Sequence, residues 1–212
     1  AGQLDRLAVA INGIDGESSP LAGLTRMQNS LQIWAARPSD ETLGDSAIDS
    51  ARILASDLNR SAQAVGEARL SIDRLALDDV TRLNDLLQRF EVAERDIAGN
   101  DNSALTAEMA MDAMDQRDDI VRQIAQIVPV TTIARNDRST MLVTSSGATI
   151  FDDTPRNVSL SLPVGGQPSQ VLIDGVPLPP SQGNDTNARG RLSALLQLRD
   201  GTLADQERQL DA

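Results

Sequence analysis

Three aspartates at helical spacing are the residues of this chain whose arrangement comes closest to a site for chemistry. Asp112, Asp115 and Asp119 follow one another at intervals of three and four residues, so on a helix they share one face. Three carboxylates can attract a divalent cation, but a hard cation usually takes about six oxygen ligands from a folded loop, and one helix face does not enclose it. We therefore expect a solvated or arginine-paired surface here and no metal site.

The residue types that most enzymes use are missing from this chain. It contains no Cys, His, Lys or Tyr, and all nineteen basic residues are arginine. This inventory excludes thiolate, imidazole and amine chemistry, the usual zinc sites and the phosphate-binding lysine. Only Asp and Glu remain for acid–base catalysis. A carboxylate enzyme acting on sugars is disfavoured, because sugar sites usually need aromatic platforms and only one Trp is available. We expect no catalysis, no catalytic residues and no cofactor.

Charge and hydropathy exclude two further classes of partner. The net charge of −12 argues against binding to nucleic acid or to an anionic membrane. No run of about eighteen apolar residues is present, so we expect no membrane span, and no secretory signal peptide is recognisable. The chain begins with Ala rather than Met, which leads us to expect a fragment or a processed product. The absence of Cys fits an exported protein that avoids disulfides.

One very long helix, predicted from Asp40 to Ala98, must position everything else. From Ile48 onwards, apolar residues recur at alternating intervals of three and four residues, which is typical of a long packed helix with one apolar seam. Ser39 or Asp40 can cap its start, and Gly99-Asn100 can end it. At about 1.5 Å per residue the helix would measure roughly 85–90 Å, which favours an elongated helical bundle over a globule.

Apolar residues at helical spacing predict four further helices, at residues 4–14, 20–36, 104–128 and 191–211. Ser19-Pro20 is a start signal for the second of these, Ser103 caps the third, and Pro129 stops it. Trp34 is expected to be a core anchor and not a ligand platform. We expect the seam of the long helix to be buried against the last three of these helices, through Leu58, Val65, Ile72, Leu83, Leu86 and Phe90.

Between residues 130 and 188 the pattern changes to short β-branched runs separated by turn residues. We predict strands at residues 130–134, 141–144, 148–151, 158–162 and 170–173, joined by turns such as Asp174-Gly175. Because the helical pattern resumes at Arg191, this stretch is expected to be an insertion. Residues 1–129 and 189–212 then form a discontinuous helical bundle, and residues 130–188 form a small antiparallel β unit. The fold class is mainly α with a β insertion (α+β).

Three passages resemble, in the same order, the motifs of flagellar hook-associated junction proteins. Ala36-Arg37-Pro38-Ser39-Asp40 is similar to the ANPSD that opens their long helix. Met114-Asp115-Gln116-Arg117-Asp118, with Val130-Thr131-Thr132-Ile133 after it, resembles their LDQRD…VGVTV passage. The segment from Gly190 to Asp200, followed by Gln209-Leu210-Asp211, is similar to the GxLxALLxxRD…QLD passage near their C-termini. Together these matches span nearly the whole chain.

The resemblance implies a structural axial subunit of the bacterial flagellum that joins hook to filament. It implies an extracellular location, export without a cleavable signal peptide, and three partners: copies of itself in a ring for the full-length protein, the hook protein, and the next junction protein. In this family the extreme ends form an inner coiled-coil layer and carry the export signal. The chain resembles the middle helical domain with its insertion, so we expect a core fragment that lacks both ends and is monomeric alone.

This sequence departs from the family pattern in two places, both in the insertion. The insertion is short, at about sixty residues, so outer domains of larger members are not carried over. Asn136-Asp137-Arg138-Ser139 stands where many relatives have a DDG turn.

Two alternative functions remain open at this point. The first is a helical signalling or interaction rod such as a chemoreceptor-like module, which shares alanine-rich heptads. The β insertion and the returning helix disfavour it, because a signalling rod has no reason to interrupt its hairpin. The second is the carboxylate-based enzyme, which the residue inventory disfavours.

The two motif-bearing helices also lead to a hypothesis about packing. Each places an arginine beside carboxylates, and the planar fork of arginine can fix the register of two helices by pairing with a carboxylate. We expect Arg199 to form a partly buried pair with Asp115, Asp118 or Asp119, so that the β insertion projects at a fixed angle. The alternative is that all of these charges are solvated.

Overall fold

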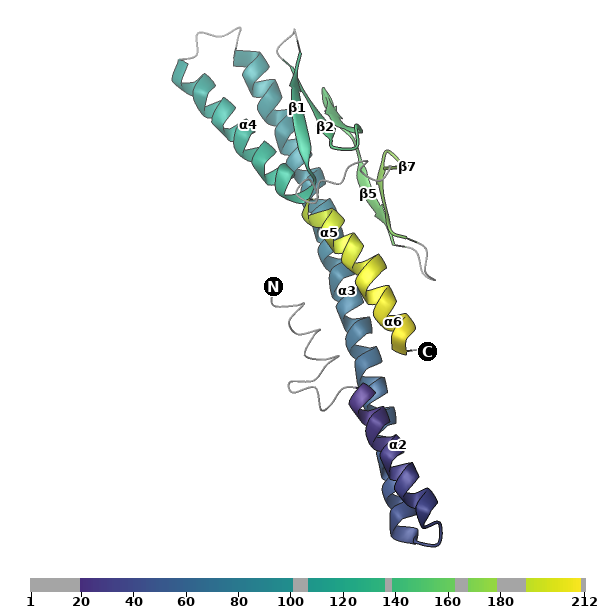
Figure 1. Cartoon of the computed structure of the whole chain (residues 1–212). Coiled ribbons are helices and arrows are strands. Elements are labelled where there is room, and N and C mark those ends of the chain that lie inside the picture. Colours follow the sequence, from purple (N-terminus) through teal and green to yellow (C-terminus); the bar gives the residue numbers. More distant parts are fainter. Residues whose placement is uncertain (1–19, 101–106, 136–138, 163–167, 179–189, 211–212) are drawn as a thin grey trace. The chain divides into compact units, whose positions relative to one another are not determined.

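The structure, a computed structural model, describes residues 20–100, 107–135, 139–162, 168–178 and 190–210 (Figure 1). The fold class is the one predicted, mainly helical with inserted antiparallel strands. Contacts divide the chain into two compact units. The first unit is Ala1–Ser71 with Gly201–Ala212, and the second unit is Ile72–Asp200. The predicted helix at residues 4–14, the Ser103 cap and the turn at Asn136-Asp137 lie outside the described residues.

The first unit contains an antiparallel pair of helices, α2 and the first half of α3. Helix α2 is Pro20–Ala36, as predicted, and α3 is a single helix of 60 residues, Glu41–Asn100. Asp40 caps α3, because its Oδ1 accepts hydrogen bonds from the amides of Thr42 and Leu43 at 3.1 and 3.4 Å. Of the two predicted caps, Asp40 is therefore confirmed.

Two glycines allow α2 and α3 to approach closely. A Cβ on Gly23 would lie 3.2 Å from Leu54 Cδ1, and one on Gly44 would lie 3.3 Å from the indole of Trp34. Trp34 therefore lies across Gly44, but 37% of its surface remains exposed. The prediction that Trp34 is a buried core anchor was wrong, because among the described residues the indole is covered on the α3 side only.

The buried seam of α3 differs from the predicted one in the first unit. The buried residues there are mostly small or polar, namely Gly44, Ala47, Ser50, Asp57, Ser61 and Val65. Ile48, predicted in the seam, is 49% exposed, and Leu58 is half-buried. Up to Ser61 the observed seam lies one residue before the predicted seam. Close approach to α2 requires small side chains on the contact face, so large apolar residues do not identify that face. From Val65 on, the predicted seam residues Val65, Ile72, Leu83, Leu86 and Phe90 are buried.

The C-terminal helix is interrupted by a π-helical turn. It consists of α5 at Arg191–Gln197, the π-helical turn Leu198–Leu203, and α6 at Ala204–Leu210. Sequence periodicity predicted one helix here. Within the first unit, Arg69 of α3 donates two hydrogen bonds to the Glu207 carboxylate of α6, at 2.8 and 2.9 Å.

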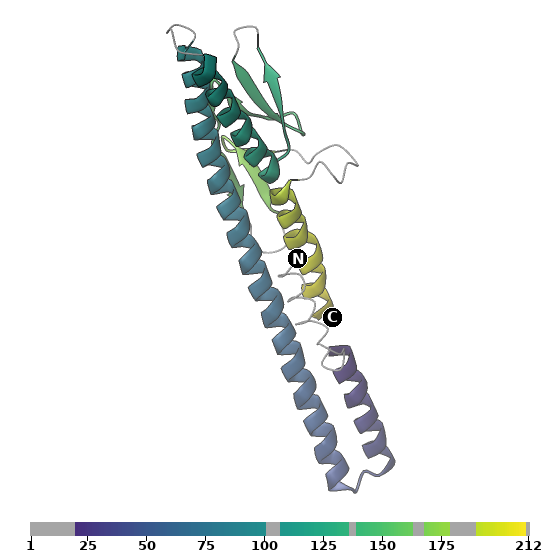
Figure 2. The ribbon, with the colours of Figure 1, turned by 90° about the vertical axis from the view of Figure 1, so that its left-hand side faces the viewer.

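The second unit places two small antiparallel sheets beside the second half of α3, α4 and α5 (Figure 2). Helix α4 is Ala107–Ile127. One sheet has the order β1-β2-β3-β4, formed by Val130–Ala134, Thr140–Thr144, Thr149–Asp152 and Thr154–Pro155. The other has the order β5-β6-β7, formed by Val158–Ser161, Gln170–Ile173 and Val176–Pro177.

The five predicted strands are confirmed to within one residue at each end, whereas β4 and β7 were missed. Each of these two is an edge strand of two residues that contains a proline, and proline normally argues against a strand. The predicted turn at Asp174-Gly175 is present, with φ of +50° and +81°, which is the left-handed geometry of a tight hairpin turn.

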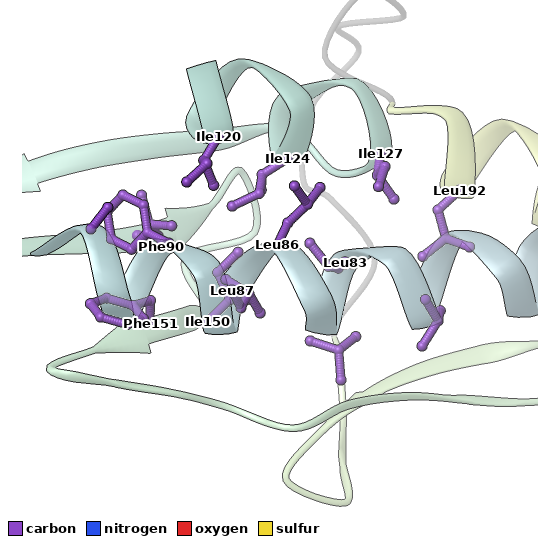
Figure 3. Close-up of a cluster of buried hydrophobic side chains, with 14 of the residues drawn as sticks. Leu83, Leu86, Leu87, Phe90, Ile120, Ile124, Ile127, Ile150, Phe151 and Leu192 are labelled. Carbon is purple, nitrogen blue, oxygen red and sulfur yellow. The ribbon is translucent and has the colours of Figure 1, made fainter. Parts of the chain in front are cut away.

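Helices and strands of the second unit share one hydrophobic core (Figure 3). Phe90 of α3 meets Phe151 of β3 edge to face, with ring centroids 4.8 Å apart. The other buried members come from α3, α4, α5 and the strands, and include Leu83, Leu86, Leu87, Ile120, Ile124, Ile127, Leu142, Ile150, Val158 and Leu192. The contact-based boundaries thus differ from the sequence-based division at residues 130–188, and that division stays a prediction.

No helix within the described ranges is both long enough and apolar enough to cross a membrane.

Candidate functional site

Four polar residues on the second half of α3 bind the elements that pack around it. They are Asp73, Asp79, Asn84 and Glu94, called the α3 anchors below. An apolar core holds elements together without fixing their register, whereas directional hydrogen bonds to buried groups do fix it. The α3 anchors are therefore the candidate site at which this chain sets the position of its inserted strands.

Arg199, at the start of the π-helical turn, makes the most buried of these contacts. It is only 3% exposed. Its Nε donates to Asp73 Oδ1 at 2.6 Å, and its guanidinium also pairs with Asp200 Oδ1 at 2.8 Å. Burial by itself lowers the pKa of Arg199, but the hydrogen bonds to Asp73 and Asp200 outweigh it, so the pKa is raised. The guanidinium is thus held in its charged form.

The same cluster binds the segment that leads into β6. Ser169 donates its backbone N–H to Asp200 Oδ2 at 2.6 Å and its hydroxyl to Asp200 Oδ1 at 3.0 Å. The Arg199 guanidinium in turn donates to the Ser169 hydroxyl oxygen at 3.0 Å. Asp73 of α3, the π-helical turn and the start of β6 are therefore tied together by one buried arginine.

Arg191 and Asp79 form a second pair, at the start of α5. Arg191 Nε donates to Asp79 Oδ2 at 2.7 Å, and a second guanidinium nitrogen donates to Asp79 Oδ1. The Asp79 side chain is 5% exposed. The hydrogen bond to Asp79 raises the pKa of Arg191. This fork-on-carboxylate geometry fixes orientation as well as charge.

Asn84 joins α3 to β5 through the backbone of one residue. Val158 donates its N–H to Asn84 Oδ1 at 3.0 Å, and Asn84 Nδ2 donates back to the Val158 carbonyl at 2.7 Å. Both hydrogen-bonding groups of one strand residue are satisfied by a single side chain, so β5 cannot slide along α3 without breaking two bonds.

Glu94 holds the first residue of β2 and faces α4. Its Oε2 accepts the Thr140 amide at 3.0 Å, and Arg117 of α4 lies 3.8 Å from Oε1. The Glu94 side chain is 13% exposed. Arg117 also donates to Asp118 at 2.9 and 3.1 Å.

A steric contact fixes the place where α5 begins. A Cβ on Gly190 would lie 2.3 Å from the carbonyl oxygen of Ile127 and 2.9 Å from Pro129 Cδ. Only glycine fits such an approach without backbone movement. The end of α4 and the start of α5 therefore meet here, and both helices lie along α3 in Figure 2.

The partners expected for Arg199 were wrong, although its predicted burial is confirmed. Asp115, Asp118 and Asp119 are exposed on α4, whereas Arg199 pairs with Asp73 and Asp200. Because α4 and α5 meet at Gly190, Arg199 lies more than two helical turns beyond that contact, and the three aspartates lie about two to three turns before it on the other side. Asp73 could not be predicted as the partner of Arg199, because pairing across 126 positions leaves no local signal.

The three aspartates at helical spacing form an exposed face of α4. Asp112, Asp115 and Asp119 are all exposed, and Asp119 pairs with Arg122 at 3.1 Å and accepts a hydrogen bond from Gln123 at 2.8 Å. The hydrogen bond from Gln123, with that from Arg122, lowers the pKa of Asp119. Within the described ranges, no group of three acidic, His or Cys side chains could hold a metal ion.

The comparison with protein families decides the assignment. Residues 12–212 match the family described as the flagellar hook-associated protein FlgK helical domain. The chain belongs to this family. No curated protein matches the chain.

Among solved structures, the flagellar hook junction protein FlgK from Burkholderia pseudomallei has the same fold. The TM-score is 0.72 at 20% sequence identity, over 98% of this chain and 39% of that one. The chain thus spans well under half the length of that relative. The family passages of the sequence also contain the arginines of the candidate site: Arg117 lies in the DQRD passage, and Arg191 and Arg199 lie in the passage that begins at Gly190.

Proposed function

We propose that this chain is a structural part of an axial subunit of the bacterial flagellum and joins hook to filament. The family match over residues 12–212 carries the proposal. It accounts for a chain without His, Cys or Lys, because a structural subunit needs packing and register and no nucleophile. In this function the chain performs no catalysis and uses no cofactor.

The α3 anchors suit such a role. A subunit in an axial assembly transmits load, so an inserted β unit must keep a fixed position on its helix. Arg199 with Asp73, Arg191 with Asp79, and Asn84 with Val158 tie the strands and α5 to α3 by directional bonds. The insertion of the second unit would then project at a fixed angle from α3 instead of swinging on a flexible link.

The proposed partners follow from the family. In the full-length protein they are further copies of itself in a ring, the hook protein and the next junction protein. The proposed location is the extracellular flagellum, reached by export without a cleavable signal peptide. The chain alone is proposed to be monomeric, because its net charge of −12 opposes self-association.

Electron microscopy of flagella from a deletion strain tests the proposal. We expect cells that carry hooks without attached filaments, and restored filaments when the full-length gene is returned. Returning two variant genes to the deletion strain tests the role of the α3 anchors. The Arg199→Met gene should restore filament attachment poorly. The Arg208→Met gene, which removes an exposed arginine of α6, should restore it fully. Normal filaments in the deletion strain would contradict the junction role.

A further inference from the structure

Helix α2 carries a row of largely apolar side chains to one side of its contact with α3. The contact side contains Gly23, Met27, Ser30 and Trp34, at intervals of four, three and four residues. A second row, Leu21, Leu24, Gln28 and Leu31, lies about 110° further round the helix; we call it the outer stripe. Leu21 is 73% exposed, Leu24 39% and Leu31 41%.

A pair of helices with this much exposed leucine is incomplete. Contiguous exposed apolar side chains on a soluble helix usually mark a surface that another element covers. The close approaches between α2 and the first half of α3 are those of Gly23 to Leu54 and of Gly44 to Trp34, and they leave Leu21, Leu24 and Leu31 exposed. The outer stripe is therefore where the missing apolar contact of this unit belongs.

The segment that precedes α2 has the matching pattern. Leu4, Leu7, Ile11 and Ile14 follow one another at intervals of three, four and three residues, and the outer stripe has the same intervals. In an antiparallel helical hairpin, residues at the same level are those whose numbers add to a constant. Four pairs satisfy one constant, namely Ile14 with Leu21, Ile11 with Leu24, Leu7 with Gln28 and Leu4 with Leu31. Three of the four pairs are apolar on both sides.

The connection between the two rows has a suitable length and composition. Residues 15–20, which contain Gly16 and end in Ser-Pro, lie between the last apolar residue of one row and the first of the other. Connections of about two to eight residues are usual between antiparallel helices, whose axes lie about 8–10 Å apart. Ser19-Pro20 is a start signal for α2, so the turn of the hairpin falls between the two paired rows.

We propose that residues 4–14 form a helix that packs antiparallel to α2 on the outer stripe. The tether gives this segment an effective concentration of about millimolar, whereas a second copy must overcome the repulsion of two chains that each carry a net charge of −12. The outer stripe is then covered within the chain, and contacts of this protein with neighbouring subunits lie on other surfaces.

A disulfide experiment on the whole chain tests this packing directly. The chain has no native cysteine, so Ile11→Cys with Leu24→Cys introduces one defined pair. The matched control is Val9→Cys with Arg26→Cys. These two residues are also level with each other in the proposed hairpin, because their numbers add to the same constant, but they lie on the far faces of the two helices. Cysteines whose Cα atoms are more than about 7 Å apart do not bridge without backbone movement. We expect the intramolecular disulfide to form at least about tenfold faster in the first pair than in the control.

Equal rates in the two pairs would overturn the proposal, and so would a disulfide in the first pair that is only intermolecular and rises with protein concentration. The second result would identify another copy as the occupant. A measurement without cysteines guards against loss of folding in the variants. Deletion of residues 1–17 should speed amide hydrogen exchange in α2 by about tenfold or more while leaving α4 unchanged. Unchanged exchange in α2 would overturn the proposal equally.

Discussion

Replacing Arg199 with Met tests the most buried contact among the α3 anchors. Methionine keeps much of the aliphatic volume of the side chain and removes the guanidinium. The carboxylates of Asp73 and Asp200 then lose the donors that lie 2.6 and 2.8 Å away, and the Ser169 hydroxyl loses a bond of 3.0 Å. The variant therefore removes the cation that both carboxylates bind, although Asp200 keeps its two hydrogen bonds from Ser169.

The structure sets the expected size of the effect. Removing one partner of a buried ion pair costs about 3–5 kcal/mol. The side chains of Asp73 and Asp200 are each 21% exposed, so water recovers part of that cost, and we expect about 2–4 kcal/mol. For a chain of this size, each kcal/mol lowers the melting temperature by roughly 2–4 °C. The Arg199→Met variant should therefore melt roughly 5–15 °C below the parent.

A double-mutant cycle separates the pair from other effects of the substitution. Arg199→Met, Asp73→Asn and the double variant, unfolded in urea, should give a coupling of about 1–3 kcal/mol. Arg208→Met is the control, because Arg208 is exposed and pairs with Asp205 in α6, and it should change stability by less than about 0.5 kcal/mol. The reasoning is refuted if Arg199→Met melts within about 2 °C of the parent or the coupling is below about 0.3 kcal/mol.

Four further outcomes are expected. Leu83→Asp places an unpaired charge in the core and should cost at least about 3 kcal/mol in urea unfolding, with the exposed Leu77→Asp as a near-neutral control. Gly190→Ala pushes a methyl group to 2.3 Å from a carbonyl oxygen and should cost about 2 kcal/mol or more, measured the same way; a neutral result would mean that α5 can shift. The pKa of Asp174 is lowered from its ordinary 3.8, first by a backbone amide and then by an arginine. Its stabilisation is therefore present above about pH 4 and is lost as the pH falls through the lower folded value, so the hydrogen-exchange protection factors of β5–β6 should fall in acid, less steeply in Asp174→Asn. Replacing residues 130–188 by a Gly/Ser linker should abolish cooperative melting because those strands share the core with α3, whereas retained cooperativity would support the sequence-based boundary.

Local signals predicted the elements of this fold well. Pro20 and Asp40 fix helix starts by covalent geometry and by capping, so the bounds of α2 and the start of α3 could be read directly. The alternation of β-branched residues located five strands to within one residue. Both kinds of signal depend on neighbours in the sequence, which is why they worked without knowledge of the tertiary structure.

Long-range features could not be read in the same way. The pairing of Arg199 with Asp73 joins residues 126 positions apart, and many other aspartates were equally available in the sequence. The π-helical turn Leu198–Leu203 is a one-residue change of register that periodicity cannot distinguish from a continuous helix. In the first unit the buried seam of α3 differs from the predicted one. Its residues Ala47, Ser50 and Ser61 are buried because they are small enough for close helix packing, and not because they are hydrophobic.

The position of the full-length protein on the flagellum tests the central claim most directly. Antibodies raised against this chain and coupled to gold can be applied to isolated flagella and located by electron microscopy, with flagella from the deletion strain as the control. The proposed function predicts label confined to the boundary between hook and filament. Label along the filament, label along the hook, or no label on wild-type flagella would contradict it.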